Sequence, residues 1–200
     1  MSLTKISNNS LSAISTLPAS IPTGSLTLLS TQTASSSASI EFTSGIDSTY
    51  SSYIFKFIDI HVSNDGVNFN FNMSIDGGST YAVTKTTTFF YAYHNEAGTT
   101  TALTYAASND LAQSTSDQII GAGIGSVADE SASGTLQLFN PSSTTFVKHF
   151  ISTMTKNSYN DFAINDYVAG YGNTTSAINA IKFLAGAGTF DGIIKMYGVS

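Results

Sequence analysis

Hydrophobic and polar residues alternate along much of the chain with a period of two, which predicts β-strands. The clearest alternation covers 67–75 (VNFNFNMSI), where every second residue is apolar and the residues between are Asn or Ser. Successive side chains of a strand point to opposite faces, whereas a helix has a longer repeat, so this run is predicted to be a strand with one apolar face. The residues just before it (Asn64-Asp65-Gly66) and after it (Asp76-Gly77) have the composition of tight turns.

Two further runs flank this strand. The run 53–62 (YIFKFIDIHV) is apolar on both faces, as expected of a central strand that is covered on two sides. The run 81–93 (YAVTKTTTFFYAY) is rich in β-branched and aromatic residues. Because short turns connect the three runs, residues 53–93 are predicted to form a three-stranded meander.

The rest of the chain has shorter strand patterns. Residues 94–134 are rich in Gly, Ala and Ser and predict loops with one or two short strands or a helical turn; within them, 121–125 (GAGIG) has the composition of a flexible loop. The other predicted strands cover 25–30, 38–43, 135–139, 145–154, 161–171, 177–184 and 190–197, with weaker candidates at 102–106 and 118–120. About eight to ten strands without a long helix or a repeat indicate an all-β fold, an antiparallel β-sandwich over residues 25–200.

Residues 1–24 differ from this pattern. Leu3, Ile6, Leu11 and Ile14 are spaced three to five residues apart in a Ser/Asn-rich background, ahead of two prolines. Two interpretations stay open: a frayed terminus, or an arm whose four apolar side chains dock on a partner or a neighbouring subunit. The segment has no apolar stretch of the secretory type, and the chain has no run of ~20 apolar residues, so neither a secretory signal nor a membrane helix is expected.

Charge narrows the classes of partner. The 200 residues carry a formal net charge of −6, and all seven basic residues are lysines. Arginine supplies most bidentate contacts to phosphates and bases, and anionic membranes attract basic patches. Neither nucleic acid nor a membrane is therefore an expected partner. Cysteine is absent, which excludes disulfides, thiol catalysis and thiolate metal sites.

No pattern of catalytic or metal-binding residues stands out. His61, His94 and His149 lack the spacing of a zinc site, and the Asp-Gly pairs are typical of turns rather than of calcium loops. We therefore expect no catalytic residue, no metal and no cofactor. Tyr91 and Tyr93 are the candidates for a binding role, because alternating aromatics on a sheet stack on sugar rings or lie in subunit interfaces; core packing is the competing explanation.

Several segments of the chain resemble small structural proteins from the virions of tailed bacteriophages, especially marine ones. The resemblance is carried by 39–60 (SIEFTSGIDSTYSSYIFKFIDI), 74–81 (SIDGGSTY), 133–143 (SGTLQLFNPSS) and 188–200 (GTFDGIIKMYGVS). The opening 3–14 (LTKISNNSLSAI) is similar to the N-terminal attachment segments of phage fibre-type proteins. The resemblance spans most of the chain and implies a jelly-roll-like accessory protein on the particle surface.

The resemblance implies a non-enzymatic role as a tail-fibre or head-fibre component or as a capsid decoration protein. The implied partners are other virion proteins of the capsid or tail, and by analogy the protein forms a homo-oligomer such as a trimer. Residues 1–24 would then be the anchor. The competing hypothesis is a carbohydrate-binding adhesin that contacts glycans of the host surface, because jelly rolls often bind glycans. A glycan-degrading enzyme is a third alternative.

Overall fold

The alternating segments form strands throughout the part of the chain that the structure describes. A computed structural model describes residues 26–200, which contain twelve strands and no helix. Within these residues there is accordingly no helix long and apolar enough to span a membrane. The strands are β1 (Leu26–Ser37), β2 (Ser39–Phe42), β3 (Ser52–Val62), β4 (Val67–Ser74), β5 (Lys85–Asn95), β6 (Thr101–Tyr105), β7 (Gln118–Ile124), β8 (Ala132–Phe139), β9 (Lys148–Ser158), β10 (Phe162–Gly172), β11 (Ala180–Ala185) and β12 (Phe190–Val199).

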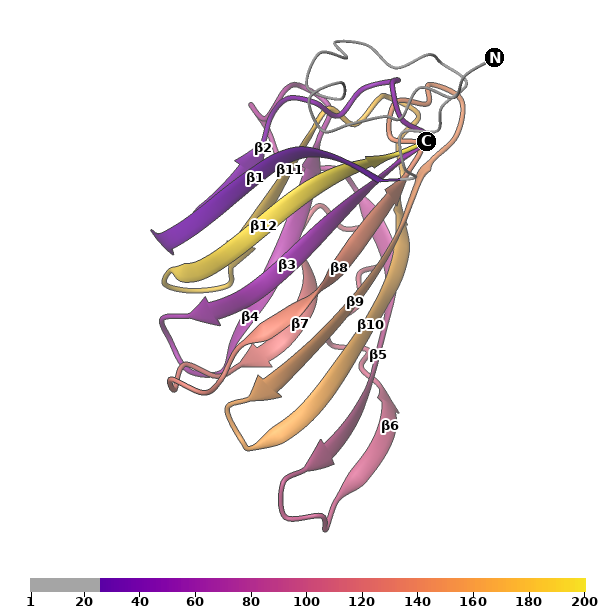
Figure 1. Cartoon of the computed structure of the whole chain (residues 1–200). Helices are drawn as coiled ribbons and strands as arrows, with labels where there is room; N and C mark the ends of the chain where they lie inside the picture. Colours follow the sequence, from indigo (N-terminus) through magenta and orange to yellow (C-terminus); the bar gives the residue numbers. More distant parts are fainter. Residues whose placement is uncertain (1–25) are drawn as a thin grey trace, which may run out of the picture.

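The strands form two antiparallel layers. The larger layer has the strand order β1-β12-β3-β8-β9-β10-β5-β6, and Figure 1 shows most of these strands crossing the view side by side. The smaller layer has the order β7-β4-β11-β2. A single pair, Ile124 of β7 with Ser158 of β9, joins the two layers along one side. The sheet therefore folds over on itself into a sandwich that is nearly closed.

The strand order identifies a jelly roll. When the hairpins β5–β6 and β9–β10 are set aside and the other eight strands are renumbered along the chain, the larger layer reads 1-8-3-6 and the smaller layer 2-7-4-5. This is the order that two interleaved Greek keys produce. The fold class predicted from the sequence, an antiparallel, jelly-roll-like β-sandwich, is confirmed. The two additional hairpins lie side by side and extend the larger layer beyond β8.

Phenylalanine fills the centre between the two layers. The ring of Phe183 on β11 lies 5.2 Å from that of Phe55 and 5.0 Å from that of Phe57, both on β3. From β4, Phe69 and Phe71 pack against the same ring at 6.2 and 6.5 Å. All five side chains are buried, and each contributes about 1.5–3 kcal/mol to folding through the apolar surface it removes from water.

The predicted meander over 53–93 is wrong, although its three strands exist. Strand β3 pairs with β12 and β8, β4 pairs with β7 and β11, and β5 pairs with β10 and β6. The turn at 63–66 carries the chain from the larger layer to the smaller one instead of closing a hairpin. Residues that form a tight turn serve both kinds of connection, so the local sequence does not distinguish them.

The expectation that β3 is covered on both faces is also wrong. A β-bulge between Phe57 and Ile60 switches the core-facing positions, so that Phe55 and Phe57 point inward before it and Ile60 and Val62 after it. The opposite face is half-buried. Asp59 in the bulge has a φ of +51°. The bulge thus explains why Ile60 and Val62 appear to lie on the other face from Phe55 and Phe57, while Ile54 and Ile58 are apolar residues of the half-buried face.

Glycine is required on the neighbouring strand at this bulge. Gly192 of β12 has a φ of +135°, and a Cβ atom there would lie 2.8 Å from the carbonyl oxygen of Asp59. Both the backbone angle and the close approach exclude a side chain without distortion.

Candidate functional site

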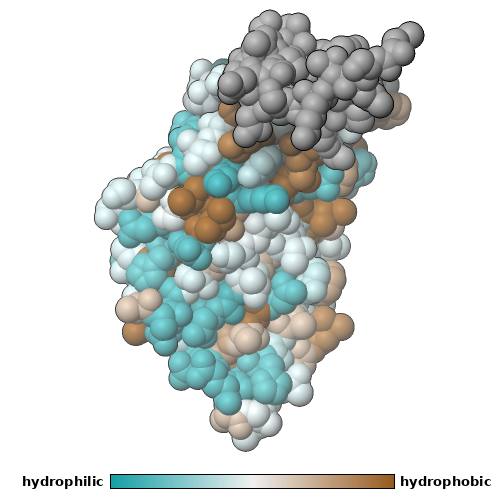
Figure 2. Space-filling view, in the orientation of Figure 1, coloured by the Kyte–Doolittle hydropathy of each residue, from teal (hydrophilic) through white to brown (hydrophobic). Residues whose placement is uncertain are grey.

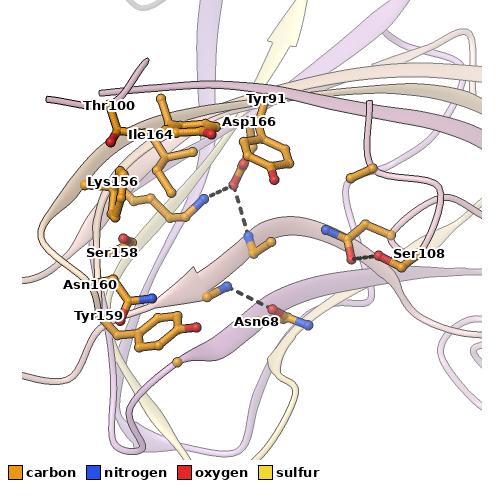
Figure 3. Close-up of a pocket in the computed structure, with 17 residues that line it drawn as sticks. Asn68, Tyr91, Thr100, Ser108, Lys156, Ser158, Tyr159, Asn160, Ile164 and Asp166 are labelled. Carbon is orange, nitrogen blue, oxygen red and sulfur yellow. Dashed lines mark hydrogen bonds and ion pairs between the residues drawn. The ribbon is translucent and has the colours of Figure 1, made fainter. Parts of the chain in front are cut away.

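A cavity forms where the larger layer extends beyond the smaller one. The inner faces of β9, β10 and β5 have no opposing sheet over part of their length, because both hairpins add strands to the larger layer only. The segment 106–117 folds back along β5, held by hydrogen bonds from Lys85 N to Ser114 O (2.7 Å) and from Thr87 N to Leu111 O (2.9 Å). Between this segment, β7 and the inner face of the hairpins lies a cavity of about 480 Å³ (Figure 3).

Aromatic rings from two neighbouring strands line one side of the cavity. Tyr91 and Tyr93 project from β5, and their ring centroids are 5.7 Å apart. Phe162 of β10 meets Tyr93 edge to face at 5.5 Å. The structure therefore places both tyrosines singled out in the sequence at this cavity. Both are half-buried, so part of each ring is accessible from the cavity.

Tyr159, in the turn between β9 and β10, forms the facing wall together with two glycines. Its ring packs against Gly66 and Gly123, where a Cβ atom would approach the ring to 3.5 and 3.3 Å. Gly123 has a φ of +67°. The prediction of a flexible loop at 121–125 is wrong for most of this segment, because strand β7 runs to Ile124. Glycine at position 123 leaves room for the ring and allows the left-handed backbone angle.

A buried ion pair lies at the floor of the cavity. Lys156 of β9 and Asp166 of β10 expose 0% and 1% of their side chains, and the lysine Nζ donates to the aspartate Oδ2. The backbone N–H of Ala122 donates to the same oxygen at 3.0 Å. Burial raises the pKa of Asp166 and lowers that of Lys156, and the opposite charge of the partner counteracts each shift. As an ion pair the two side chains have no net charge.

The second carboxylate oxygen of this pair is one of five buried side-chain polar atoms that lack a hydrogen-bond partner among the described residues. Asp166 Oδ1 is buried and has no hydrogen-bond partner within residues 26–200. Most buried polar atoms in folded proteins have a partner, and an unpaired one costs about 1–3 kcal/mol. Because Asp166 borders the cavity, a bound ligand is one means of satisfying this oxygen.

Uncharged polar groups surround the rest of the cavity. Asn68 of β4 accepts a hydrogen bond from Gly123 N through Oδ1 (2.9 Å), which leaves its amide N–H groups available. In Figure 3, Asn68 and Tyr159 lie across the cavity from Lys156 and Tyr91. The remaining polar lining residues are also neutral: Thr100, Ser108, Asn109, Ser158 and Asn160. Apart from the ion pair, the lining therefore carries no charged side chain.

The sequence alone did not point to the ion pair, although a signal for it exists. In β9, Lys156 is in phase with the core residues Phe150 and Met154, and in β10 Asp166 is in phase with Val168. A charged residue at an inward position of a strand indicates either a buried partner or a site. The strand predicted from the sequence covered only 145–154 and ended before Lys156. The inward position of Lys156 in the strand was therefore not recognised.

The other candidate residues are not brought together. His61, His94 and His149 lie on β3, β5 and β9, none of which is a direct neighbour of another. Within the described part of the chain, no group of three or more His, Cys, Asp or Glu side chains is placed to hold a metal ion. The proposed docking residues Leu3, Ile6, Leu11 and Ile14 fall outside the described residues.

A second candidate surface lies on the opposite face of the same hairpins. We call it the outer patch and define it as Phe90, Leu103, Tyr105, Ile151 and Tyr167. Leu103 and Ile151 are 71% and 53% exposed, and Phe90 stacks on Tyr167 with the ring centroids 4.9 Å apart. Figure 2 shows hydrophobic side chains in separate patches on the surface of the molecule, between hydrophilic ones.

Comparisons of the chain with protein-family models, with curated proteins and with solved structures found no match. The function is therefore inferred from the cavity, the outer patch and the sequence pattern.

Proposed function

We propose that this chain is a non-enzymatic structural protein on the surface of a phage particle, and that it forms a homo-oligomer through the outer patch. The resemblance of its sequence to small virion proteins and its jelly-roll fold support this role. The observation that carries the proposal is the outer patch, because exposed apolar side chains gathered on one face mark interaction sites.

A second copy of the chain is the occupant that fits this patch. None of its five residues is charged, and the Asp110 carboxylate at its border accepts a hydrogen bond from the Tyr105 hydroxyl. Two copies therefore meet there with less repulsion than is expected elsewhere between chains of net charge −6. Two residues of the patch, Leu103 and Tyr105, lie on β6, the strand at the edge of the larger layer. An edge strand exposes unpaired backbone groups, which association with a second copy shields from other partners.

The experiment is light scattering on the full chain. An oligomer such as a trimer is expected for the native sequence, and Leu103→Asp or Ile151→Asp should convert it to monomers. The matched control is Leu28→Asp, since Leu28 on β1 is 52% exposed at the other end of the same layer and should leave the mass unchanged. A monomer at all concentrations, or an equal effect of the control, would contradict self-association through this patch.

In this proposal residues 1–24 attach the oligomer to the particle. Deletion of the segment should leave the oligomer intact and abolish incorporation into particles, measured by protein gels of purified virions. Incorporation at the native level would show that attachment does not depend on these residues.

A second candidate function, binding to glycans of the host surface, is favoured by the position of Tyr91 and Tyr93 in the cavity. Aromatic rings that are partly accessible in a cavity offer stacking surfaces to sugar rings. The test is a glycan array probed with the full chain. Saturable binding that is lost in Tyr91→Ala would support this function, and absence of binding to every glycan would contradict it.

A further inference from the structure

We infer that the cavity beneath the two hairpins is a binding site for a neutral sugar, with the unpartnered carboxylate oxygen of Asp166 as the acceptor for a sugar hydroxyl. The inference rests on the second candidate function, glycan binding, and specifies the ligand class and the residues that select it.

Charge excludes acidic ligands. Lys156 and Asp166 neutralise each other, the other lining side chains are uncharged, and the chain has no arginine that could pair with a carboxylate or phosphate. An acidic sugar would lose its hydration on entering the cavity and find no free cation there. A neutral sugar avoids this penalty. Since the lysine is already paired, it is not available as an anchor for an anion.

The lining offers both kinds of contact that a neutral sugar needs. The rings of Tyr93, Phe162 and Tyr159 present apolar faces to the C–H groups of a pyranose. The amide of Asn68 can donate to ring or hydroxyl oxygens, because its own Oδ1 is already occupied by Gly123 N–H. A few directed polar groups among aromatic walls are typical of small-molecule sites.

Asp166 supplies the independent indication of a ligand. Its Oδ2 is held by Lys156 and by the Ala122 N–H, which fixes the carboxylate, while Oδ1 has no partner within the described residues. A buried acceptor that is held in place without a donor lowers the stability of the protein, but it can accept a hydrogen bond from a ligand hydroxyl without having to move. Once a hydroxyl group donates to Oδ1, both carboxylate oxygens have a hydrogen-bond partner.

The size of the cavity agrees with this ligand class. Its volume of about 480 Å³ lies within the range of about 300–1,000 Å³ that encloses small molecules. The site is thus suited to one or two sugar units at the end of a glycan rather than to a long chain.

The test is saturation-transfer NMR and a glycan array with the full chain, using glucose, galactose, mannose, glucuronate and N-acetylneuraminate and glycans that end in them. Binding of at least one neutral sugar is expected, and no binding of the acidic sugars. Tyr93→Ala and Tyr159→Ala should weaken binding at least about tenfold. His94→Ala is the matched control, because His94 is exposed next to Tyr93 on the same strand and belongs neither to the cavity lining nor to the outer patch.

The outcomes separate the two hypotheses. A preference for acidic sugars, or equal losses in His94→Ala and Tyr93→Ala, would overturn the assignment of this cavity and leave glycan binding elsewhere on the protein intact. Absence of binding to every glycan would overturn both the glycan-binding function and this inference. Circular dichroism of each variant, with native-like spectra and melting, ensures that a loss of binding is not a loss of fold.

Discussion

Lys85 provides a prediction whose size follows directly from the structure. The side chain is wholly buried at the start of β5, and its Nζ donates to Asn72 Oδ1 (2.6 Å) and to Val83 O (2.8 Å). Burial lowers the pKa of Lys85 from 10.5 to about 8, partly offset by the charge of Asp117. The native state therefore releases this proton at lower pH than the unfolded chain does.

The sign of the effect on stability follows from this difference. Between about pH 8 and pH 10.5 the unfolded chain binds more protons than the native protein, so the free energy of unfolding rises with pH across this window. The full shift corresponds to about 3 kcal/mol, and the part gained between about pH 8 and pH 9.5 to about 1.5 kcal/mol. Burial also lowers the pKa values of Lys148 and Lys156, which adds to the same trend.

The assay compares the native chain with Lys85→Met by urea unfolding, followed by circular dichroism, at several pH values from about 7 to 9.5. The free energy of unfolding of the native chain should rise by about 1.5 kcal/mol more than that of the variant from about pH 8 to pH 9.5. Measurement stops below pH 10, because burial and Glu41 raise the pKa of Tyr81 to about 12 and reverse the slope above that pH.

Parallel pH profiles for the native chain and the variant would refute this reasoning. They would mean that the Lys85 ammonium group is no less solvated in the native state than in the unfolded chain. Lys85→Gln serves as a second variant in case Lys85→Met does not fold.

Two further predictions concern stability. Lys156→Met should lower the free energy of unfolding by about 3–5 kcal/mol, because it leaves the Asp166 carboxylate buried without its partner, and Lys156→Met with Asp166→Leu should recover most of the loss. Urea unfolding at neutral pH measures both, and a double variant no better than the single one would show that the ion pair is not the cause. Gly192→Ala should destabilise by about 1–3 kcal/mol, since a Cβ atom would meet Asp59 O at 2.8 Å at a positive φ. Thermal melting tests this loss, and an unchanged melting temperature would contradict the requirement for glycine at the bulge.

The strands were predictable from the sequence, whereas their neighbours were not. The alternation over 67–75 marks the apolar side chains that face the core wherever the strand is placed, here Phe69, Phe71 and Met73. Asn72 and Ser74 on the other face are also buried, which the alternation does not predict. Pairing, by contrast, depends on residues that are distant in the chain: Phe71 of β4 pairs with Phe183 of β11. The turn before β4 gave no indication of a crossing between layers, and the meander prediction failed for that reason.

Of the residues that line the cavity, some were predictable from the sequence and others were not. Tyr91 and Tyr93 were found because two tyrosines at alternate positions on a strand form a visible local pattern. Their companions Asn68, Gly123 and Tyr159 come from β4, β7 and the turn after β9, and no local pattern links them. These residues come together only when the whole chain folds, so the site could not be predicted from local sequence patterns.

The two additional hairpins have a consequence for how this protein can change over evolutionary time. Strand β5 joins the larger layer only by pairing with β10, so loss of the β9–β10 hairpin would detach the β5–β6 hairpin from the sheet. Loss of the β5–β6 hairpin would in turn leave one side of β10 unpaired along its whole length. The hairpins are therefore expected to be inherited or lost together. The eight-stranded frame, in contrast, has its own pairing and aromatic core, and it can persist while the attached hairpins diverge. Distant homologues should consequently share the frame and differ in the hairpins, and with them in whatever the cavity binds.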